Sequence, residues 1–241
     1  MRLALTTLLL AGCALLLLSE GSPPGRIEFR DVAEKAGIHS LVVSGGMQKN
    51  YVLEVNGSGA CWFDYNNDGY PDLYLVNGST LEALQGKKPR PATNHLYRNN
   101  RNGTFTDVTE AAHVPGSDWG FGCVAADYDN DGRTDLLVTN FGPNILYHNN
   151  GDGTFTEVAS HAGVSGGNIW HTGAAFGDYD NDGYVDLYVA GYLDFNVKNP
   201  ELKTCDYRGV KVHACGPLGY RGAPDALYHN NRDGTFTEVT E

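Results

Sequence analysis

The sequence predicts an all-β fold, a β-propeller of four-stranded blades that is incomplete in this chain, with about three to four blades. The first observation is a repeated strand segment, FTDVTE or a close variant, which begins at Phe29, Phe105, Phe155 and Phe236. The second is a hairpin segment of the type NILYHNNGDGTF, which precedes three of these copies. The third is an acidic nonapeptide of the type DYDNDGYVD, which occurs three times. Repetition of whole units of about 50 to 60 residues is typical of propellers rather than sandwiches.

Residues 1–25 are expected to be a signal peptide. They contain one arginine, an apolar run from Leu3 to Leu18 and a polar, proline-rich end, which is the pattern of an export signal. The run is shorter than the roughly 20 residues of a membrane span. We therefore expect a secreted, periplasmic or cell-surface protein without a membrane span. Leu10–Cys13 resembles a bacterial lipidation signal, so a lipid anchor at Cys13 is an alternative, although the apolar residues 14–18 argue against it.

Each repeat unit within residues 26–241 is expected to read strand, acidic loop, strand, strand, hairpin, strand. A small, glycine-rich run precedes each acidic loop, and an alternating run such as DLYLV follows it. An Asn-Gly or Asp-Gly pair between two short β-type runs predicts a type I′ hairpin turn. The third unit carries an insertion over residues 191–224 before its hairpin. Because a ring needs at least about four blades, we expect a fragment that is truncated after residue 241.

The acidic loops concentrate the negative charge of the chain. They hold eleven of the 29 Asp and Glu residues, and Arg133 is the single basic residue within them. The formal charge of the chain is −12, which removes the electrostatic basis for binding nucleic acid. Carboxylates at alternate positions of a tight loop are the ligands that a hard cation such as Ca²⁺ prefers.

The predicted metal ligands follow one pattern in all three loops. Side chains at positions one, three, five and nine and the backbone carbonyl at position seven provide oxygen, while glycine at position six permits the turn. The predicted sites are Asp64, Asn66, Asp68, Tyr70 and Asp72; Asp127, Asp129, Asp131, Arg133 and Asp135; and Asp178, Asp180, Asp182, Tyr184 and Asp186. About three Ca²⁺ ions would change the formal charge from −12 to −6. Because Asn66 replaces a carboxylate, we expect the first site to bind Ca²⁺ most weakly.

One copy of such a loop would fit an ordinary polar turn as well as a metal site. Three copies in register favour the metal site, because carboxylates held a few ångströms apart repel one another without a cation. The loops differ from an EF-hand, since position nine is Asp, position twelve is apolar and the flanking segments read as strands. Mg²⁺ and Mn²⁺ are alternative ions, but flexible oxygen cages suit Ca²⁺ better.

The combination of FTDVTE, LYHNNGDGTF and DYDNDGYVDL resembles the FG-GAP or VCBS repeats of integrin-type propellers. It is most similar to the CRTAC1-like family, which comprises cartilage acidic protein and bacterial relatives that often end in an ASPIC/UnbV domain. The resemblance covers about residues 27–241. It implies an extracytoplasmic calcium-binding propeller with an adhesive or scaffolding role.

The cysteines suggest one disulfide. Cys205 and Cys215 lie in the insertion and are expected to bridge, whereas a zinc site that combines them with His213 would lack a fourth ligand. Cys61 and Cys123 occupy non-equivalent strand positions relative to their loops. We expect them to face opposite ways and to be small buried residues rather than a bridge.

Three large residues precede the predicted inner strands, namely Trp119, Trp170 and His171. They would form a platform for a glycan or a peptide at the top of the propeller, or alternatively they would fill the core, with His171 as a satisfied polar residue.

No recognisable catalytic motif is present, such as a nucleophile elbow or an HExxH pair, and we do not expect an enzyme. The leading hypothesis is a binding, adhesion or scaffolding module for proteins or glycans outside the cytoplasm. One alternative is a calcium-dependent polysaccharide lyase or other carbohydrate-active enzyme. Such an enzyme would need a base near the loops, and only His171 and Arg133 are close in sequence. A second alternative is a structural propeller that supports a missing C-terminal domain.

Overall fold

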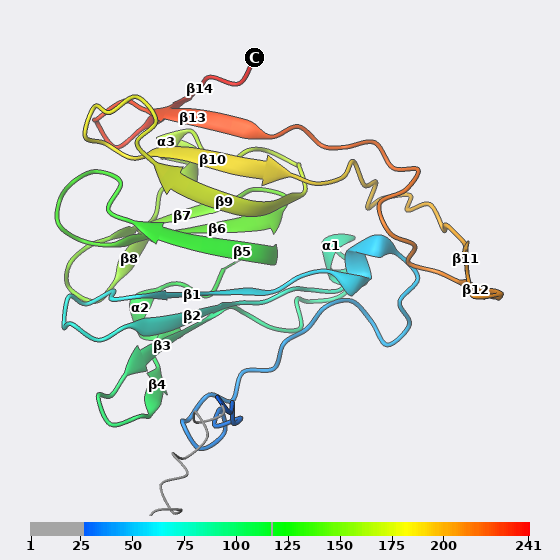
Figure 1. Ribbon diagram of the computed structural model, residues 1–241, viewed down its shortest axis with the longest axis horizontal. Coiled ribbons are helices and arrows are strands. Elements are labelled where there is room, and N and C mark those ends of the chain that lie inside the picture. Colours follow the sequence, from blue (N-terminus) through cyan, green and yellow to red (C-terminus); the bar gives the residue numbers. More distant parts are fainter. Residues whose placement is uncertain (1–26, 117) are drawn as a thin grey trace, which may run out of the picture. The chain divides into compact units, whose positions relative to one another are not determined.

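The computed structural model describes residues 27–116 and 118–241 (Figure 1). The predicted signal peptide and the candidate anchor Cys13 lie outside these residues. By its internal contacts the chain divides into residues 1–32 and a larger unit, Ala33–Glu241. In the part of the chain that is described, the larger unit is all-β apart from helices of a single turn, which agrees with the predicted fold class.

Three four-stranded antiparallel sheets, here called blades 1 to 3, form the larger unit. Their strands are β1 (Gly59–Phe63), β2 (Asp72–Val76), β3 (His95–Asn99) and β4 (Phe105–Asp107) in blade 1; β5 (Trp119–Ala126), β6 (Asp135–Phe141), β7 (Ile145–Asn149) and β8 (Phe155–Glu157) in blade 2; and β9 (His171–Gly177), β10 (Asp186–Gly191), β13 (Ala226–Asn230) and β14 (Phe236–Glu238) in blade 3. A fourth sheet is the hairpin of β11 (Cys205–Tyr207) and β12 (Val210–Val212). The described residues do not close a ring of blades.

Neighbouring blades pack face to back. Tyr74 of blade 1 and Leu136 of blade 2 share one core cluster, and Leu137 of blade 2 shares another with Leu187 of blade 3. All four side chains are fully buried. Because successive residues of a strand point to opposite faces, blade 2 offers one face to each neighbour.

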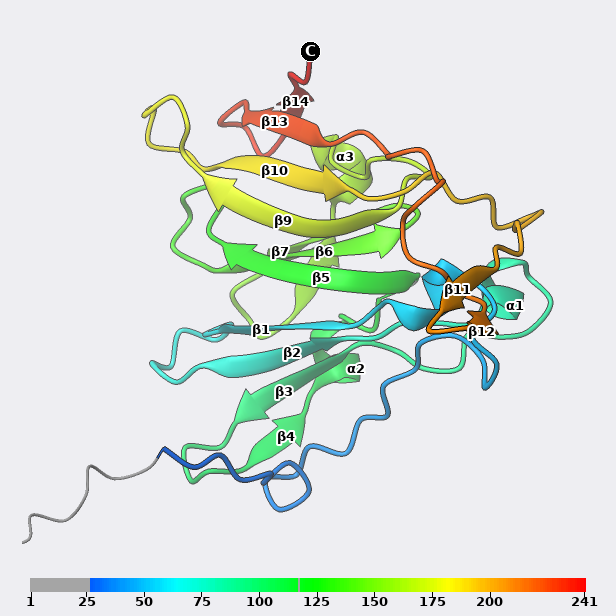
Figure 2. The same ribbon diagram turned by 45° about the vertical axis from the view of Figure 1, so that its right-hand side comes forward.

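The inner strands β1, β5 and β9 lie side by side (Figure 2). A Cβ atom at Gly122 in β5 would lie 2.6 Å from the carbonyl oxygen of Thr172 in β9. A side chain would therefore force these strands apart, which explains why the runs before the acidic loops are rich in small residues.

The two ends of the blades differ in their connections (Figure 1). At the loop end, residues 64–71, 127–134 and 178–185 join the first two strands of each blade, and the hairpins join the last two. At the opposite end, which we call the insertion end, the second and third strands are joined by residues 77–94, 142–144 and 192–225. The acidic loops and the insertion therefore lie at opposite ends of the blades.

The hairpins differ from the predicted type I′ turn. In blade 1 the residues with positive φ are Arg101 (61°) and Gly103 (81°), whereas a type I′ turn needs two consecutive residues in that region. The side-chain oxygen of Asn102 instead accepts a hydrogen bond from the amide of Thr104 at 3.0 Å. The residue before the glycine is thus used as a side-chain acceptor. The same bond recurs in the other hairpins, from Thr154 to Asp152 and from Thr235 to Asp233.

The first copy of the repeated strand segment was wrongly predicted to be a strand. Phe29 is 97% exposed, and no strand includes it. Single-turn helices were not predicted: they are η1 (Val52–Val55), α1 (Leu81–Leu84), α2 (Thr109–Ala112) and α3 (Ala159–Ala162). One turn is too short to show a helical periodicity in the sequence. No described helix has the length and apolar content needed to cross a membrane.

An aromatic core fills the insertion end. Trp119 and Trp170 are 0% and 1% exposed, and both pack in a cluster with Phe195 of the insertion and Leu53 of η1. Trp170 alone contacts the rings of four neighbours, Phe121, Phe141, Tyr192 and Phe195. The two tryptophans are therefore core residues rather than an exposed platform.

His171 is also buried, but it is not fully satisfied. Its side chain is 1% exposed, and Nδ1 has no hydrogen-bond partner. Burial lowers the pKa of the ring, an effect that the backbone of Gly142 partly offsets. His171 is neutral in this environment, and β9 holds it at the insertion end, away from the acidic loops.

Two disulfides are present in the described chain. The predicted bridge joins Cys205 and Cys215, with Cα atoms 5.9 Å apart, so these thiols are not zinc ligands. A second bridge joins Cys61 and Cys123, also with Cα atoms 5.9 Å apart, and the prediction of two separate cysteines was wrong. Face-to-back packing is the reason: residues on opposite faces of neighbouring blades meet at their common interface. Disulfides of this kind are typical of oxidising, extracytoplasmic compartments.

Candidate metal centres at the acidic loops

The three acidic loops share one backbone conformation. The carboxylate at position one accepts amide hydrogen bonds from positions five and six; in the first loop Asp64 accepts from Asp68 at 3.0 Å and from Gly69 at 2.7 Å. The glycine at position six has positive φ, 83° for Gly69, as predicted for the turn. The same bonds occur in the other loops, with Asp127 and Asp178 as acceptors.

The aspartate at position nine is buried in every loop. Asp72 and Asp135 are 0% exposed and Asp186 is 2% exposed. Each accepts one amide bond from position two of its loop and one from the asparagine that ends the third strand; for Asp135 the donors are Tyr128 at 3.2 Å and Asn149 at 2.8 Å. The sheet therefore fixes this carboxylate in place before any ligand arrives.

Burial makes ionisation of Asp72 and Asp135 unfavourable in the metal-free chain. It raises the pKa of Asp72 to about 6 and that of Asp135 to about 7, although backbone amides partly offset the effect. Burial also raises the pKa of Asp129, with the charge of Asp131 as a second cause. A bound cation would reverse this balance by stabilising the ionised forms.

Ligand atoms of the predicted residues converge in the second and third loops. Among the described residues, one oxygen each from Asp127, Asp129 and Asp135 lies within 4.8 Å of the others, and so does one each from Asp178, Asp180 and Asp182. In the first loop Asn66 occupies the position of Asp129. Its oxygen accepts the amide of Asp68 at 3.2 Å, and Asp129 accepts the amide of Asp131 at 3.3 Å. The first loop thus has the same shape with one carboxylate fewer.

The carbonyls at position seven, from Tyr70, Arg133 and Tyr184, stay predictions. The amide groups of these residues donate to the aspartate at position five, at 3.0, 2.9 and 2.8 Å respectively. These bonds place the peptide of position seven next to the carboxylate cluster.

An arginine binds the position-five aspartate in each loop. In blades 1 and 3 it comes from the hairpin: Arg101 lies 2.9 Å from Asp68, and Arg232 lies 2.6 Å from Asp182. The hydrogen bond of Arg101 lowers the pKa of Asp68. In Asp182 the amide of Tyr184 is the largest cause of a lowered pKa, followed by Arg232.

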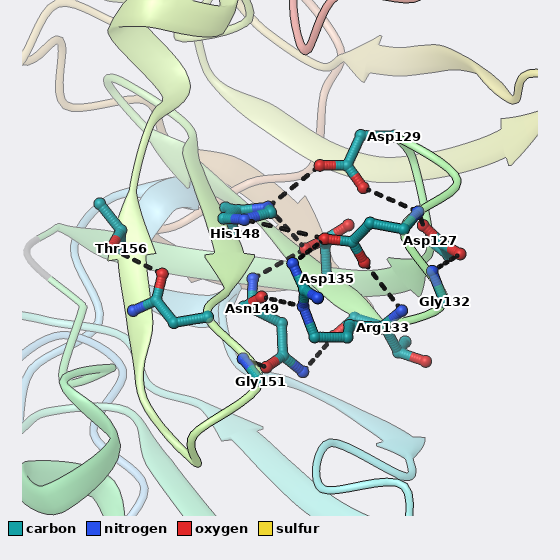
Figure 3. A network of polar contacts seen from close by, with 12 residues as sticks. Asp127, Asp129, Gly132, Arg133, Asp135, His148, Asn149, Gly151 and Thr156 are labelled. Carbon is teal, nitrogen blue, oxygen red and sulfur yellow. Dashed lines mark hydrogen bonds and ion pairs between the residues drawn. The ribbon is translucent and has the colours of Figure 1, made fainter.

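In blade 2 the arginine that pairs with the position-five aspartate comes from the acidic loop rather than from the hairpin. This hairpin has Gly151 where the others have arginine, and the loop itself provides Arg133, which pairs with Asp131. A Cβ atom at Gly151 would lie 2.7 Å from Cδ of Arg133, so the loop arginine fills the space that the hairpin leaves. Figure 3 shows Arg133 between its loop and the hairpin strand, where its Nε donates to the carbonyl of Asn149 at 2.8 Å.

Two histidines beside the loops were missed by the sequence analysis. His148 of β7 lies against the carboxylates of the second loop (Figure 3), and His229 of β13 lies against those of the third. The argument that basic residues are scarce near the loops was therefore wrong, because the strands that enter the hairpins return to the loop end. The sequence feature that could have revealed these histidines is the repeated segment LYxNN, whose variable position holds Arg98, His148 or His229.

Neighbouring loops are joined by asparagine side chains. Asn67 at position four of the first loop donates to the carbonyl of Gly132 at 3.0 Å. Asn130 of the second loop donates in the same way to Gly183 of the third at 2.9 Å. The geometry of each loop is thus coupled to that of the next.

The repeats identify the family to which the chain belongs. The sequence profile of the FG-GAP-like repeat matches residues 64–138 and 127–189, which together span 126 of the 241 residues, more than half of the chain. The chain belongs to the FG-GAP-like repeat family. Each match begins at the first aspartate of an acidic loop and ends in the strand that follows the next loop. No curated protein matches the chain.

The FG-GAP repeats supply donors that fit a divalent cation. Carboxylate oxygens cluster in each of the second and third loops, and two buried nitrogens, Nδ1 of His148 and Nδ1 of His229, lack hydrogen-bond partners beside them. Unpaired buried polar atoms are costly unless a ligand completes them. The acidic groups of these repeats could therefore hold metal ions.

A cavity of about 380 Å³ lies at the insertion end, far along the blades from the loops. Trp170 and Phe195 line it together with the charged residues Asp194 and Arg221. The indole nitrogen of Trp170 is buried without a hydrogen-bond partner. The cavity thus combines an aromatic wall with a small number of polar groups, as ligand sites do.

Proposed function

We propose that this FG-GAP repeat chain is an extracytoplasmic, calcium-binding propeller module of the CRTAC1-like type, which binds proteins or glycans and is not itself an enzyme. About three Ca²⁺ ions occupy the acidic loops, with the ligands predicted from the sequence. The observation that carries the proposal is the aspartate at position nine, which is buried and held by two backbone amides in all three loops.

The metal acts on structure rather than on chemistry. Each cage joins two strands of its blade, and the asparagine bonds from Asn67 and Asn130 join the cages to one another. A cation at one loop therefore stabilises the neighbouring loop as well. The Ca²⁺-loaded loops hold the blades in register, and the ligand surface lies elsewhere, with the cavity beside Trp170 as the proposed binding site.

Calorimetry tests the metal part of the proposal. We expect Ca²⁺ titration of the full chain to show about three binding events, the first loop being the weakest, and excess EGTA to lower the melting temperature. Asp135→Asn removes a ligand of the second loop, and Glu110→Gln, an exposed acid of α2, is the matched control. If the chain melts at the same temperature with Ca²⁺ and with EGTA, the proposal of structural calcium is wrong.

A glycan array and a pull-down with extracellular matrix proteins test the binding role on the Ca²⁺-loaded chain. Arg221→Ala should weaken a ligand that occupies the cavity, while Arg208→Ala, in the exposed β11–β12 turn, should not. Cleavage of an acidic polysaccharide would instead support the lyase. In a lyase, His148 and His229 would be the candidate bases near the loops. However, both rings contact loop carboxylates.

A further inference from the structure

The histidines His148 and His229 occupy the same place in blades 2 and 3. Each directly precedes the asparagine whose amide binds the buried position-nine aspartate, Asn149 for Asp135 and Asn230 for Asp186. The strand thus brings the imidazole to the same side of both cages. In blade 1 the equivalent residue is Arg98, which is exposed and makes no ion pair with the first loop among the described contacts.

Both rings approach two carboxylates at once. Nδ1 of His148 lies 3.3 Å from Oδ2 of Asp129 and 3.3 Å from Oδ1 of Asp135. Nδ1 of His229 lies 3.5 Å from Oδ2 of Asp180 and 3.2 Å from Oδ1 of Asp186. The two cages therefore repeat one arrangement, in which a nitrogen faces the carboxylates of positions three and nine. Figure 3 shows this arrangement for the second loop.

These nitrogens are near the oxygens without bonding to them. Nδ1 of each ring is buried and has no hydrogen bond of acceptable geometry. Ligands bound at about 2.1 to 2.4 Å from one ion lie roughly 3.0 to 3.4 Å apart in octahedral geometry. Three of the four observed separations, 3.2 to 3.3 Å, fall within that range, and the fourth, 3.5 Å between His229 and Asp180, is slightly longer. A nitrogen and two oxygens can therefore share one ion after a small adjustment.

The donor set determines which ion each cage prefers. Ca²⁺ takes oxygen ligands, whereas a mixture of imidazole and carboxylate suits divalent transition-metal ions. We propose that the cages of blades 2 and 3, besides binding Ca²⁺ through oxygen, accept a divalent first-row transition-metal ion in its place through His148 and His229, while the cage of blade 1, which lacks a histidine, binds through oxygen alone. The proposal rests on the metal-binding function proposed above and divides its three sites into two kinds.

Mn²⁺ is the probe, because electron spin-echo modulation detects a directly bound nitrogen. The full chain loaded with Mn²⁺ is expected to show nitrogen modulation, and His148→Gln together with His229→Gln should remove it. The double variant should also lower Mn²⁺ affinity at two sites by at least about tenfold and leave Ca²⁺ affinity within about threefold. The matched control Arg98→Gln should change neither quantity, and Arg98→His should add a third nitrogen-bound site.

The unaltered chain alone can overturn the proposal, so the test does not depend on the folding of a variant. Absence of nitrogen modulation in the Mn²⁺-loaded chain contradicts it, as does modulation that persists in the double variant. If Ca²⁺ binds and no nitrogen is detected, this inference fails while the proposed function stands. If neither Ca²⁺ nor Mn²⁺ binds, the proposed function fails as well.

Discussion

The loop end and the insertion end of the blades are stabilised in different ways. At the loop end three copies of one loop repeat the same hydrogen bonds, and the buried groups are carboxylates such as Asp135. At the insertion end η1, α1 and the insertion each occur once, and they contribute to a single aromatic core around Trp170. We expect the stability of the first to depend on pH and on cations, and that of the second to depend mainly on apolar burial.

Metal removal should have the largest effect and act on the loop end alone. Three sites, each at a Ca²⁺ concentration one hundred times its Kd and counted without the coupling between neighbouring loops, would stabilise the chain by about 8 kcal/mol relative to EGTA. Asp135→Asn should remove about a third of this gain. Denaturant unfolding with Ca²⁺ and with EGTA measures both. A gain that Asp135→Asn leaves intact would show that the second loop binds no cation.

Trp170→Ala should be the most damaging change at the insertion end. Loss of a fully buried tryptophan costs about 3 to 5 kcal/mol, and the cost should be equal in Ca²⁺ and in EGTA because the ring lies far from the loops. Trp62→Ala is the matched control, since Trp62 is 58% exposed and should cost less than about 1 kcal/mol. A loss at Trp170 that depends on Ca²⁺ would mean that the two ends are coupled.

The two disulfides should contribute unequally. Cys61–Cys123 closes 62 residues and joins blades 1 and 2, whereas Cys205–Cys215 closes ten residues within the insertion. Chain-entropy arguments give about 4 kcal/mol for the longer loop and about 3 kcal/mol for the shorter. Unfolding of the paired Cys→Ser variants of each bridge measures this. Equal losses would indicate that the blade interface is stable without its bridge.

The effect of pH on the free energy of unfolding should be the smallest of these effects. Its sign should differ between the metal-free and the metal-bound chain. Burial raises the pKa of Asp135 to about 7, above its ordinary value of about 3.9, so the folded chain binds a proton that the unfolded chain has released. Without metal, stability should therefore rise as the pH falls from 8 to 6, by about 1.4 kcal/mol from this carboxyl. Unfolding in EGTA at both pH values measures the rise.

Two comparisons isolate the contribution of Asp135. His171 opposes the rise, because burial lowers its pKa and protonation favours the unfolded chain. Asp135→Asn keeps the effects of Asp72 and His171 and should remove the part of the rise that comes from Asp135. With Ca²⁺ bound, protons compete with the cation and the stability should fall over the same range. A metal-free chain as sensitive to pH as its Asp135→Asn variant would contradict the assignment.

The sequence predicted the repeated part of the molecule and the disulfide of the insertion, but it missed contacts that depend on how the chain packs in three dimensions. The blades and acidic loops could be read because each is a local pattern present three times. The disulfide Cys61–Cys123 could not, because it depends on how one blade faces the next. His148 and His229 were missed for a related reason: they lie 13 and 43 residues after the aspartates Asp135 and Asp186 that they contact. The aromatic core at the insertion end occurs once, so it gives no repeated sequence pattern from which it could be predicted.

The asparagine at position four gives the blades a directional connection. Asn67 reaches forward from blade 1 to blade 2, and Asn130 reaches forward from blade 2 to blade 3. Blade 2 therefore carries both a donor for its successor and an acceptor for its predecessor. A gene duplication that copies one whole unit would bring both halves of the connection with it, so the number of blades can change without redesign of an interface.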